Sequence, residues 1–564
     1  KKQAVKLLSY MAGPAYYTNK KLFCLIAGKI VSLSLKYGNI SESCTGYSMY
    51  GMVHNSVFGN YKTGYDFNLL AMKLSEKFRA PAQRCIVSNI FGNFIFHWVR
   101  PLKEKDTINI EGYRAGLEGG ELEFAGYCLC HRGEDYFYSG NKCLKDMLSD
   151  ITDYIHFAEK TVNKMAIDIL TCLTIIITNL SGFTKDKLCF DTEDIKEEEF
   201  LDNCHKNKNH RVLCEYYTLK AQVLYLYGKT SDALTYIIKA KELSEYIWGL
   251  FISAEYNFYY SLILSDLYHE CNEEIRKEYE EEIKRNQKQM KIWADNCPEN
   301  FLHKYLLVEA EIARISGHTV ESIDYYSRAI ILAREHEFIK DEMVAQERAG
   351  KFWDKRGNKD YAGLHLRKAF YGYSIMGAMS KIEDMKEKYG EYLSERPQKK
   401  TPDTEMFSPS SSSSELLDLG TVIRASHIIS GEIVLENLIN KTMVLLIEHS
   451  GAQRGFLILE NDGIFNVEAQ IEGDKHTVIK SIGIKECDNI SVKIVTYVER
   501  TRDTFILNDA FREGNFINDP YILRNNIRAL LCMPLIHQDK LTGILYLENN
   551  ITSGIFTQNK IEML

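Results

Sequence analysis

A recurring spacing of glycine and small residues constrains the first half of the chain more than any other feature. Four times, a glycine ends a helical stretch and small residues follow it five and twelve positions later. The four sets are Gly59 with Gly64 and Ala71, Gly228 with Ala233 and Ala240, Gly317 with Ser322 and Ala329, and Gly357 with Ala362 and Ala369. Glycine permits the turn between antiparallel helices, and small residues let the helix axes approach. The spacing therefore predicts stacked helical hairpins, which would offer a concave face to a peptide or a neighbouring domain.

A bulky residue stands nine positions after most of these glycines, between the small positions. These residues are Ile237, Tyr326 and Leu366, whereas Asn68 departs from the pattern. The combination resembles the tetratricopeptide repeat, and the resemblance extends over roughly residues 43–395.

The repeat is irregular along the chain. Gly317 and Gly357 lie 40 residues apart, whereas a regular array would have about 34. The stretch 75–205 matches the spacing poorly. We therefore expect a weakly repeat-like helical region over residues 1–205 and tetratricopeptide-like repeats over 206–395. An unrelated α-helical bundle with a chance glycine spacing is the alternative.

A proline- and serine-rich segment divides the chain. Three prolines precede a run from Ser410 to Ser414, and such a composition cannot bury a core. Residues 396–414 are therefore predicted to be a flexible linker. The following region, 415–564, is predicted to begin with two helices, Glu415–Ser430 and Glu432–Ser450. Its strand signals are Gly455–Glu460, Phe465–Gln470, Thr504–Leu507, Ala529–Ile536 and Leu541–Glu548, with a helix near Ser491–Arg500. This pattern indicates an α/β domain with an antiparallel sheet.

Four segments of this second region resemble the GAF domain, a small-molecule-sensing fold. They are QRGFLILE (453–460), FILNDA (505–510), NDPY (518–521) and MPLIHQDKLTGILYLEN (533–549). The expected fold class is thus multidomain, with an all-α tetratricopeptide-like solenoid followed by an α/β GAF sensor domain.

A larger class is suggested by three further segments. They are NFYYSLILSDLY (257–268), KIWADNCPENFLHKYLLVEAEIAR (291–314) and GEIVLENLI (431–439). They resemble hybrid signalling kinases, in which a serine/threonine kinase and a nucleotide-binding ATPase module precede the helical repeats and a GAF domain and a sensor histidine kinase follow. The sequence begins with Lys and stops within TQNKIEML, the expected opening of a helix. We therefore expect both ends to be cuts in a longer polypeptide. A non-kinase scaffold or a transcription regulator with the same modules is the alternative.

Catalytic motifs are missing from the sequence. It contains no G-x-x-x-x-G-K-[ST] phosphate loop and no kinase signature, the nearest being Asp66-Phe67-Asn68, which lacks the glycine of D-F-G. His427 has no following Glu, so it is expected to be an ordinary polar helix position and not a phospho-acceptor. This chain is therefore expected not to be an enzyme, although the full-length protein would be a kinase.

Cysteine and histidine clusters do not indicate a metal site. On a helix, residues two apart such as Cys128 and Cys130 point to nearly opposite sides. The set Cys204, His205, His210 and Cys214 matches no standard zinc finger. A GAF-type thiol enzyme, the remotest alternative, would need Cys487 or Cys532. We expect Cys532 to be inert, because an apolar strand raises the pKa of a thiol.

The GAF resemblance implies a ligand cavity between the sheet and its helices. Its expected ligand-binding residues are Asn508, Asp509, Asp519, Tyr521, Leu530 and Cys532. Short polar loops over an apolar sheet can supply the few hydrogen bonds that a ligand needs. The alternative is that Asn508, Asp509 and Asp519 only cap turns and the next helix. The identity of the ligand and of any cofactor is unknown from the sequence.

Composition bears on location and partners. With 69 Lys+Arg against 77 Asp+Glu, the formal charge is -8, and nothing indicates nucleic-acid binding. The 14 scattered cysteines favour a reducing cytoplasm. The longest apolar run, Met165–Leu180, is too short for a membrane span and is interpreted as a buried helix. An apolar stripe of Leu416, Leu419 and Ile423 predicts a homodimer through the helices that flank the GAF domain.

Overall fold

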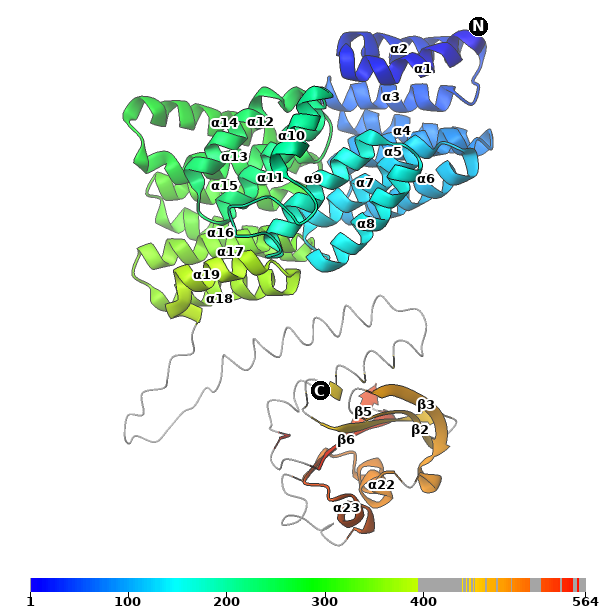
Figure 1. Ribbon diagram of the computed structural model, residues 1–564, viewed down its shortest axis with the longest axis vertical. Coiled ribbons are helices and arrows are strands. Elements are labelled where there is room, and N and C mark those ends of the chain that lie inside the picture. The colour runs from blue at the N-terminus through cyan, green and yellow to red at the C-terminus, as the bar shows by residue number, and fades with distance from the viewer. Residues whose placement is uncertain are drawn as a thin grey trace. The chain divides into compact units, whose positions relative to one another are not determined.

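The computed structural model divides the chain into two compact units, Lys1–Ser394 and Glu395–Leu564 (Figure 1). It describes residues 2–393, single positions between 439 and 450, and then 452–461, 464–472, 475–487, 489–507, 519–537, 540–550, 555 and 556. The predicted linker, His427 and the stripe around Leu419 lie outside the described residues. The fold class expected from the sequence, helical hairpins followed by an antiparallel sheet with helices, is confirmed.

The first unit is built from helices alone. Its α-helices are α1 (Lys2–Thr18), α2 (Lys20–Tyr37), α3 (Ser43–Ser56), α4 (Tyr61–Lys77), α5 (Pro81–Phe94), α6 (Lys105–Gly119), α7 (Leu122–Ser139), α8 (Leu144–Lys160), α9 (Lys164–Leu180), α10 (Glu197–Lys206), α11 (His210–Leu226), α12 (Thr230–Glu242), α13 (Ile252–Leu267), α14 (Glu273–Asn296), α15 (Pro298–Ile315), α16 (Thr319–Glu335), α17 (Ile339–Lys355), α18 (Lys359–Met376) and α19 (Met379–Leu393). Short 3₁₀ helices cover Phe96–Trp98, Leu102–Glu104, Ser244–Ile247 and Tyr268–Glu270. The apolar run 165–180 lies in α9 as a buried helix, and no helix within the described residues is long and apolar enough to cross a membrane.

The turns between helices explain why the repeat looked irregular. Gly317, Gly357 and Gly377 have φ of 79°, 75° and 80°, and Glu337, halfway between the first two, also adopts a left-handed φ of 64°. The helical hairpin therefore repeats every 40 residues, with a turn at each half. In the stretch that matched poorly, Arg79 and Val162 hold the same kind of turn. A search for turn glycines misses such positions, because residues other than glycine adopt a backbone conformation there that favours glycine.

Val162 is the most strained of these turn residues. It is β-branched, has φ 55° and is 86 % exposed, so no packing contact compensates its backbone conformation. Val162→Gly is therefore expected to stabilise the helical unit by about 1 kcal/mol. Urea denaturation measures the change, with Val162→Ala as the control that retains a Cβ. A glycine variant no more stable than the alanine variant would show that the turn is not strained.

The small residues of the repeat lie at tight helix contacts, as expected. Ala369 is fully buried in α18. On the facing α17, a Cβ added at Gly350 would lie 2.7 Å from Leu366 Cγ and 3.4 Å from the Ala362 carbonyl oxygen. The two helices thus approach too closely for larger side chains at these positions.

Overpacking the buried face of α18 is expected to be costly. Ala369→Leu should destabilise the helical unit by about 1–3 kcal/mol, because the added carbons have no free volume to enter. Ser374→Leu, on an exposed position of the same helix, is the control and should change stability little. If both variants unfold at the same urea concentration as the parent, Ala369 is not at a packed helix interface.

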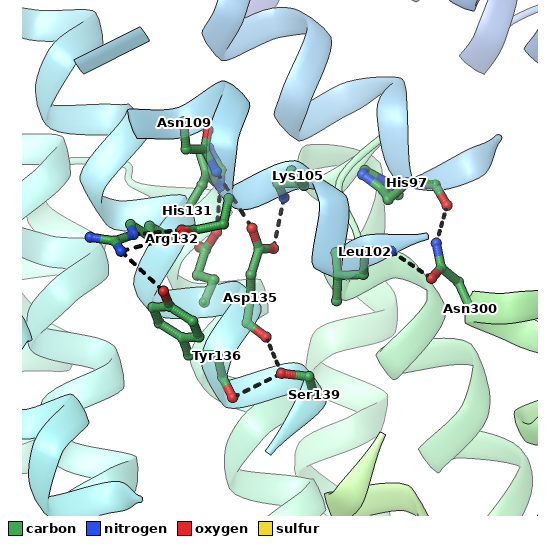
Figure 2. Close-up of polar contacts among 12 residues, drawn as sticks. His97, Leu102, Lys105, Asn109, His131, Arg132, Asp135, Tyr136, Ser139 and Asn300 are labelled. Carbon is green, nitrogen blue, oxygen red and sulfur yellow. Dashed lines mark hydrogen bonds and ion pairs between the residues drawn. The ribbon is translucent and has the colours of Figure 1, made fainter. Parts of the chain in front are cut away.

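The inner helices are enclosed by the rest of the unit. Every residue of α11 from Arg211 to Leu226 is buried. Early and late helices also meet, because Ser380 Oγ donates to the Asn179 carbonyl at 2.8 Å. Asn300 Nδ2 donates to the His97 carbonyl at 2.7 Å, as Figure 2 shows. The surface of the inner helix α11 is therefore buried in contacts within the unit. Peptide docking on a concave face remains a prediction.

The second unit contains a six-stranded antiparallel sheet of order β3-β2-β1-β6-β5-β4. The strands are β1 (Arg454–Asn461), β2 (Ile464–Glu472), β3 (Lys475–Gly483), β4 (Phe505–Leu507), β5 (Ala529–His537) and β6 (Lys540–Asn549). The described helices are α22 (Val492–Thr501), α23 (Pro520–Asn525) and a 3₁₀ turn over Ile484–Glu486. Side chains of α22 and α23 share a core with one sheet face, to which β6 contributes Ile544 and Tyr546.

Candidate functional site

A buried polar cluster lies where β1, β6 and α23 meet. Its centre is Glu548, whose side chain is fully buried at the end of β6. Tyr521 donates its hydroxyl to Glu548 Oε1 at 2.9 Å, and Arg454 Nη1 lies 3.1 Å from the same oxygen. An acid, a base and a phenol from three elements thus converge beneath an otherwise apolar sheet face.

Burial governs the chemistry of this cluster. It raises the pKa of Glu548 from 4.5 to about 7, against the opposing effect of Arg454 and the Tyr521 hydrogen bond. Burial and the neighbouring Glu548 also raise the pKa of the Tyr521 phenol. Glu548 can therefore gain or lose a proton near neutral pH, and its hydrogen bonds can change with it.

A second group of hydrogen bonds connects the cluster to α22. Asp519 caps α23, since its Oδ1 accepts from the Tyr521 amide at 2.9 Å. Its other oxygen accepts from Ser491 Oγ at 3.0 Å, and Ser491 in turn caps α22. The Ser491 amide donates to the Tyr546 hydroxyl at 3.3 Å. The starts of α22 and α23 are therefore joined by side chains that also contact the sheet.

The predicted ligand-binding residues fall into three groups. Asp519 and Tyr521 belong to the polar cluster just described. Leu530 and Cys532 are fully buried on β5 and form part of the core under the helices, where burial raises the pKa of the Cys532 thiol. Asn508 and Asp509 lie outside the described residues. The structure thus gives Asp519 the capping role that the sequence offered as its alternative, and ligand contact remains a prediction for all six.

Sequence reasoning missed the central residue of the cluster. Glu548 was present in the GILYLEN motif, but only as part of a family pattern. Ile544, Tyr546 and Glu548 alternate along β6, so they point to the same face of the sheet. The sequence could have shown this, because Glu548 stands two residues after Tyr546 and four after Ile544, and a carboxylate at that spacing faces the apolar core. The partner Arg454 could not be inferred, because it depends on the pairing of β1 with β6.

A cavity of about 260 Å³ lies in the helical unit between α6, α7 and the α16–α17 turn. Its wall residues include Leu102, Asp106, Asp135, Tyr136, Ser139 and Glu337. Figure 2 shows Asp135 between Lys105 Nζ, at 2.7 Å, and Asn109 Nδ2, at 3.5 Å. Arg132 binds Asp106, and Lys103 binds Glu337 at 2.6 Å. Each wall carboxylate is thus paired within the unit, and the cavity indicates no ligand class.

Metal-ligating side chains do not gather anywhere in the described part of the chain. No group of three or more His, Cys, Asp or Glu residues there could hold a metal ion. Of the residues considered from the sequence, His131 contacts Glu134, and Cys214 donates to the Ala240 carbonyl at 3.3 Å.

The second unit matches a known family. Residues 434–564 match the GAF domain. A solved GAF domain of A. aeolicus nlh2 covers 25 % of this chain and 83 % of its own length at 14 % identity, with a TM-score of 0.19. Yeast Tom70 covers 68 % of this chain and 89 % of its own length at 12 % identity, with a TM-score of 0.28.

One curated relative was found by sequence. The chain is 36 % identical over 90 residues to a protein of Dictyostelium discoideum named hybrid signal transduction histidine kinase G. The aligned part is 15 % of this chain and 3 % of that protein. The family match itself concerns residues 434–564 and does not extend to the helical unit.

Proposed function

We propose that this chain is the regulatory and sensory portion of a signal-transduction kinase. A helical-repeat scaffold is joined to a GAF domain that senses a small molecule and controls a histidine kinase encoded beyond Leu564. The observation that carries the proposal is the Arg454–Tyr521–Glu548 cluster. It connects the sheet to α23 within a region that matches the GAF domain.

The cluster offers a physical route for a signal. A ligand that binds near α23 would compete for the Tyr521 hydroxyl or change the protonation of Glu548. Because Asp519 joins the starts of α22 and α23 through Ser491, either change would shift helix positions against the sheet. A homodimer would pass that shift to a dimeric kinase. The resemblance to hybrid kinases, the serine/threonine kinase and ATPase modules included, belongs to this proposal, as does a cytoplasmic location.

Ligand sensing is tested by hydrogen–deuterium exchange on the whole chain. A panel of nucleotides, amino acids and organic acids supplies the probes. One class should slow exchange in peptides that span α23 and β6, and Tyr521→Phe should abolish the effect because the phenol hydroxyl is lost. Tyr497→Phe on the partly exposed face of α22 is the matched control. Protection that is equal in the two variants would exclude the cluster from ligand sensing.

Catalysis is expected to lie outside this chain. Incubated with labelled ATP, it should neither hydrolyse the nucleotide nor label itself, because the sequence has no phosphate loop or kinase signature. Stoichiometric label on the chain, or turnover that persists through repurification, would contradict a purely regulatory role. The alternative, a non-kinase scaffold or transcription regulator, predicts no histidine phosphorylation even in the full-length protein.

A further inference from the structure

The α1–α2 hairpin at one end of the helical unit (Figure 1) differs in charge from the rest of the chain. The first 41 residues contain 7 Lys and no Asp, Glu or Arg, whereas the whole chain has a formal charge of -8. Lys6 and Lys20 lie 3.7 Å and 3.8 Å from Glu42 and Glu245. Within the described residues, Lys21 and Lys29 form no ion pair and are exposed. The hairpin is therefore a concentrated cationic surface on an acidic protein.

The same hairpin exposes large apolar side chains. On α1, Val5, Ala12 and Ala15 face the core. The opposite face carries an apolar stripe, with exposed fractions given after each name: Leu7 (61 %), Tyr10 (72 %), Met11 (45 %) and Tyr17 (47 %). Their spacing of three, four and six or seven residues places them on one side of the helix. Leu7, Tyr10 and Met11 have no covering element among the described residues, whereas burial raises the pKa of the Tyr17 phenol, which also interacts with Arg211 and Glu123 of the same unit.

Helix α2 combines both properties on its outward face. Leu25 is 71 % exposed. Lys21 precedes it by four residues, and Lys29 and Lys36 follow it by four and eleven, so all three lysines lie on the same side of the helix. Lys36 lies 5.4 Å from the ring centroid of Tyr37, itself exposed. Exposed leucine and tyrosine side chains thus lie beside lysine ammonium groups. Such a surface suits the boundary between lipid headgroups and acyl chains, because the aliphatic part of lysine contacts apolar groups while its ammonium reaches the anionic headgroups.

We propose that the α1–α2 hairpin docks the chain on an anionic phospholipid surface. The lysines bind the headgroups, and Leu7, Tyr10 and Leu25 enter the interface between headgroups and acyl chains. A second copy of the same face is a poorer occupant, because it would oppose lysine to lysine and the hairpin itself carries no carboxylate. The absence of any acidic residue through position 41 is what selects an anionic surface.

Flotation of the whole chain with vesicles tests this proposal. Vesicles of phosphatidylcholine with about one-third phosphatidylserine should bind the chain, pure phosphatidylcholine should not, and added salt should weaken binding. The triple variant Lys21→Gln, Lys29→Gln, Lys36→Gln should bind on the order of a hundredfold more weakly, at about fivefold per lysine. Leu7→Ser with Leu25→Ser should also lose binding while circular dichroism stays unchanged.

Matched controls use exposed residues elsewhere on the helical unit. Lys145→Gln with Lys185→Gln, and Val320→Ser, should bind vesicles as the parent does. The proposal would be overturned if the chain bound neutral and anionic vesicles equally. It would also be overturned if the control variants lost as much vesicle binding as the hairpin variants. Sedimentation showing a dimer without lipid that Leu7→Ser with Leu25→Ser dissociates would overturn it too, because the face would then belong to a second copy.

Discussion

Lys304→Met is expected to destabilise the helical unit by about 3–5 kcal/mol, the largest effect of any single substitution considered. Lys304 is fully buried in α15, where Nζ lies 2.6 Å from Glu255 Oε1 and also binds Asp341. Lys340 Nζ lies 3.0 Å from Glu255 Oε2, and His303 Nε2 lies 2.9 Å from Asp341 Oδ2. Removal of Lys304 leaves two buried carboxylates with one lysine, and methionine cannot supply the missing charge.

The cluster joins helices that are distant in sequence, so its loss should lower the free energy of unfolding of the whole helical unit. Glu255 is on α13, Lys304 on α15 and Asp341 on α17. Burial alone would raise the pKa of Asp341, but Lys304, His303 and Lys340 hold it below its usual range. Urea denaturation followed by far-ultraviolet circular dichroism measures the effect. The control is Lys359→Met, whose partner Glu391 is 62 % exposed, and it should change stability by less than about 1 kcal/mol. Equal midpoints for the two variants would refute a structural role for the buried cluster.

The second large effect is a pH dependence that originates in Glu548. Burial raises its folded-state pKa to about 7 from 4.5, so the folded unit holds the proton more tightly than the unfolded chain does. Its contribution to stability is fully present below about pH 4.5 and is lost as the pH rises through about 7. The loss amounts to about 3 kcal/mol. Glu548→Gln should remove this contribution to the change of unfolding free energy with pH, since glutamine does not titrate.

Exchange rates of amides in β5 and β6 give the local free energy of unfolding across this pH range. Corrected for intrinsic exchange, protection in the parent should fall between about pH 5 and pH 7.5 more steeply than in Glu548→Gln. Glu486→Gln replaces an exposed glutamate of the same unit. Its protection should change with pH as the protection of the parent does. If the protection of Glu548→Gln also changes as in the parent, the buried carboxylate is not the titrating group.

Helical content and five of the six strands were predictable because they depend on local patterns, whereas β3 was not among the predicted strands. The glycine and alanine spacings identified buried small positions such as Ala362 and Ala369, and the segment around Ala529–Glu548 identified β5 and β6. The full extent of the repeat was not predictable, because Val162 and Glu337 take left-handed turn conformations at positions where the pattern required glycine. Local propensity gives no sign of such turns, because valine and glutamate rarely adopt a positive φ.

The candidate site was only half predictable for a related reason. Asp519 and Tyr521 were found because they stand in the segment NDPY (518–521), which resembles the GAF domain. Arg454 and Glu548 lie 94 residues apart and meet only through the register of β1 with β6. The buried ion pairs of the helical unit share this property, since Glu255 and Asp341 are joined by a lysine from a third helix. Charged residues on amphipathic helices usually indicate solvent-exposed faces, and only the packing of three helices shows otherwise.

The most direct test of the proposed function is histidine autophosphorylation of the full-length protein. Parent, Tyr521→Phe, Glu548→Gln and the exposed control Glu486→Gln should be compared by acid-labile phosphate incorporation from labelled ATP. If the GAF region controls a histidine kinase through the Arg454–Tyr521–Glu548 cluster, the two cluster variants should change the rate several-fold and the control should match the parent. Absence of acid-labile label in the parent, or equal rates in all four proteins, would contradict the account.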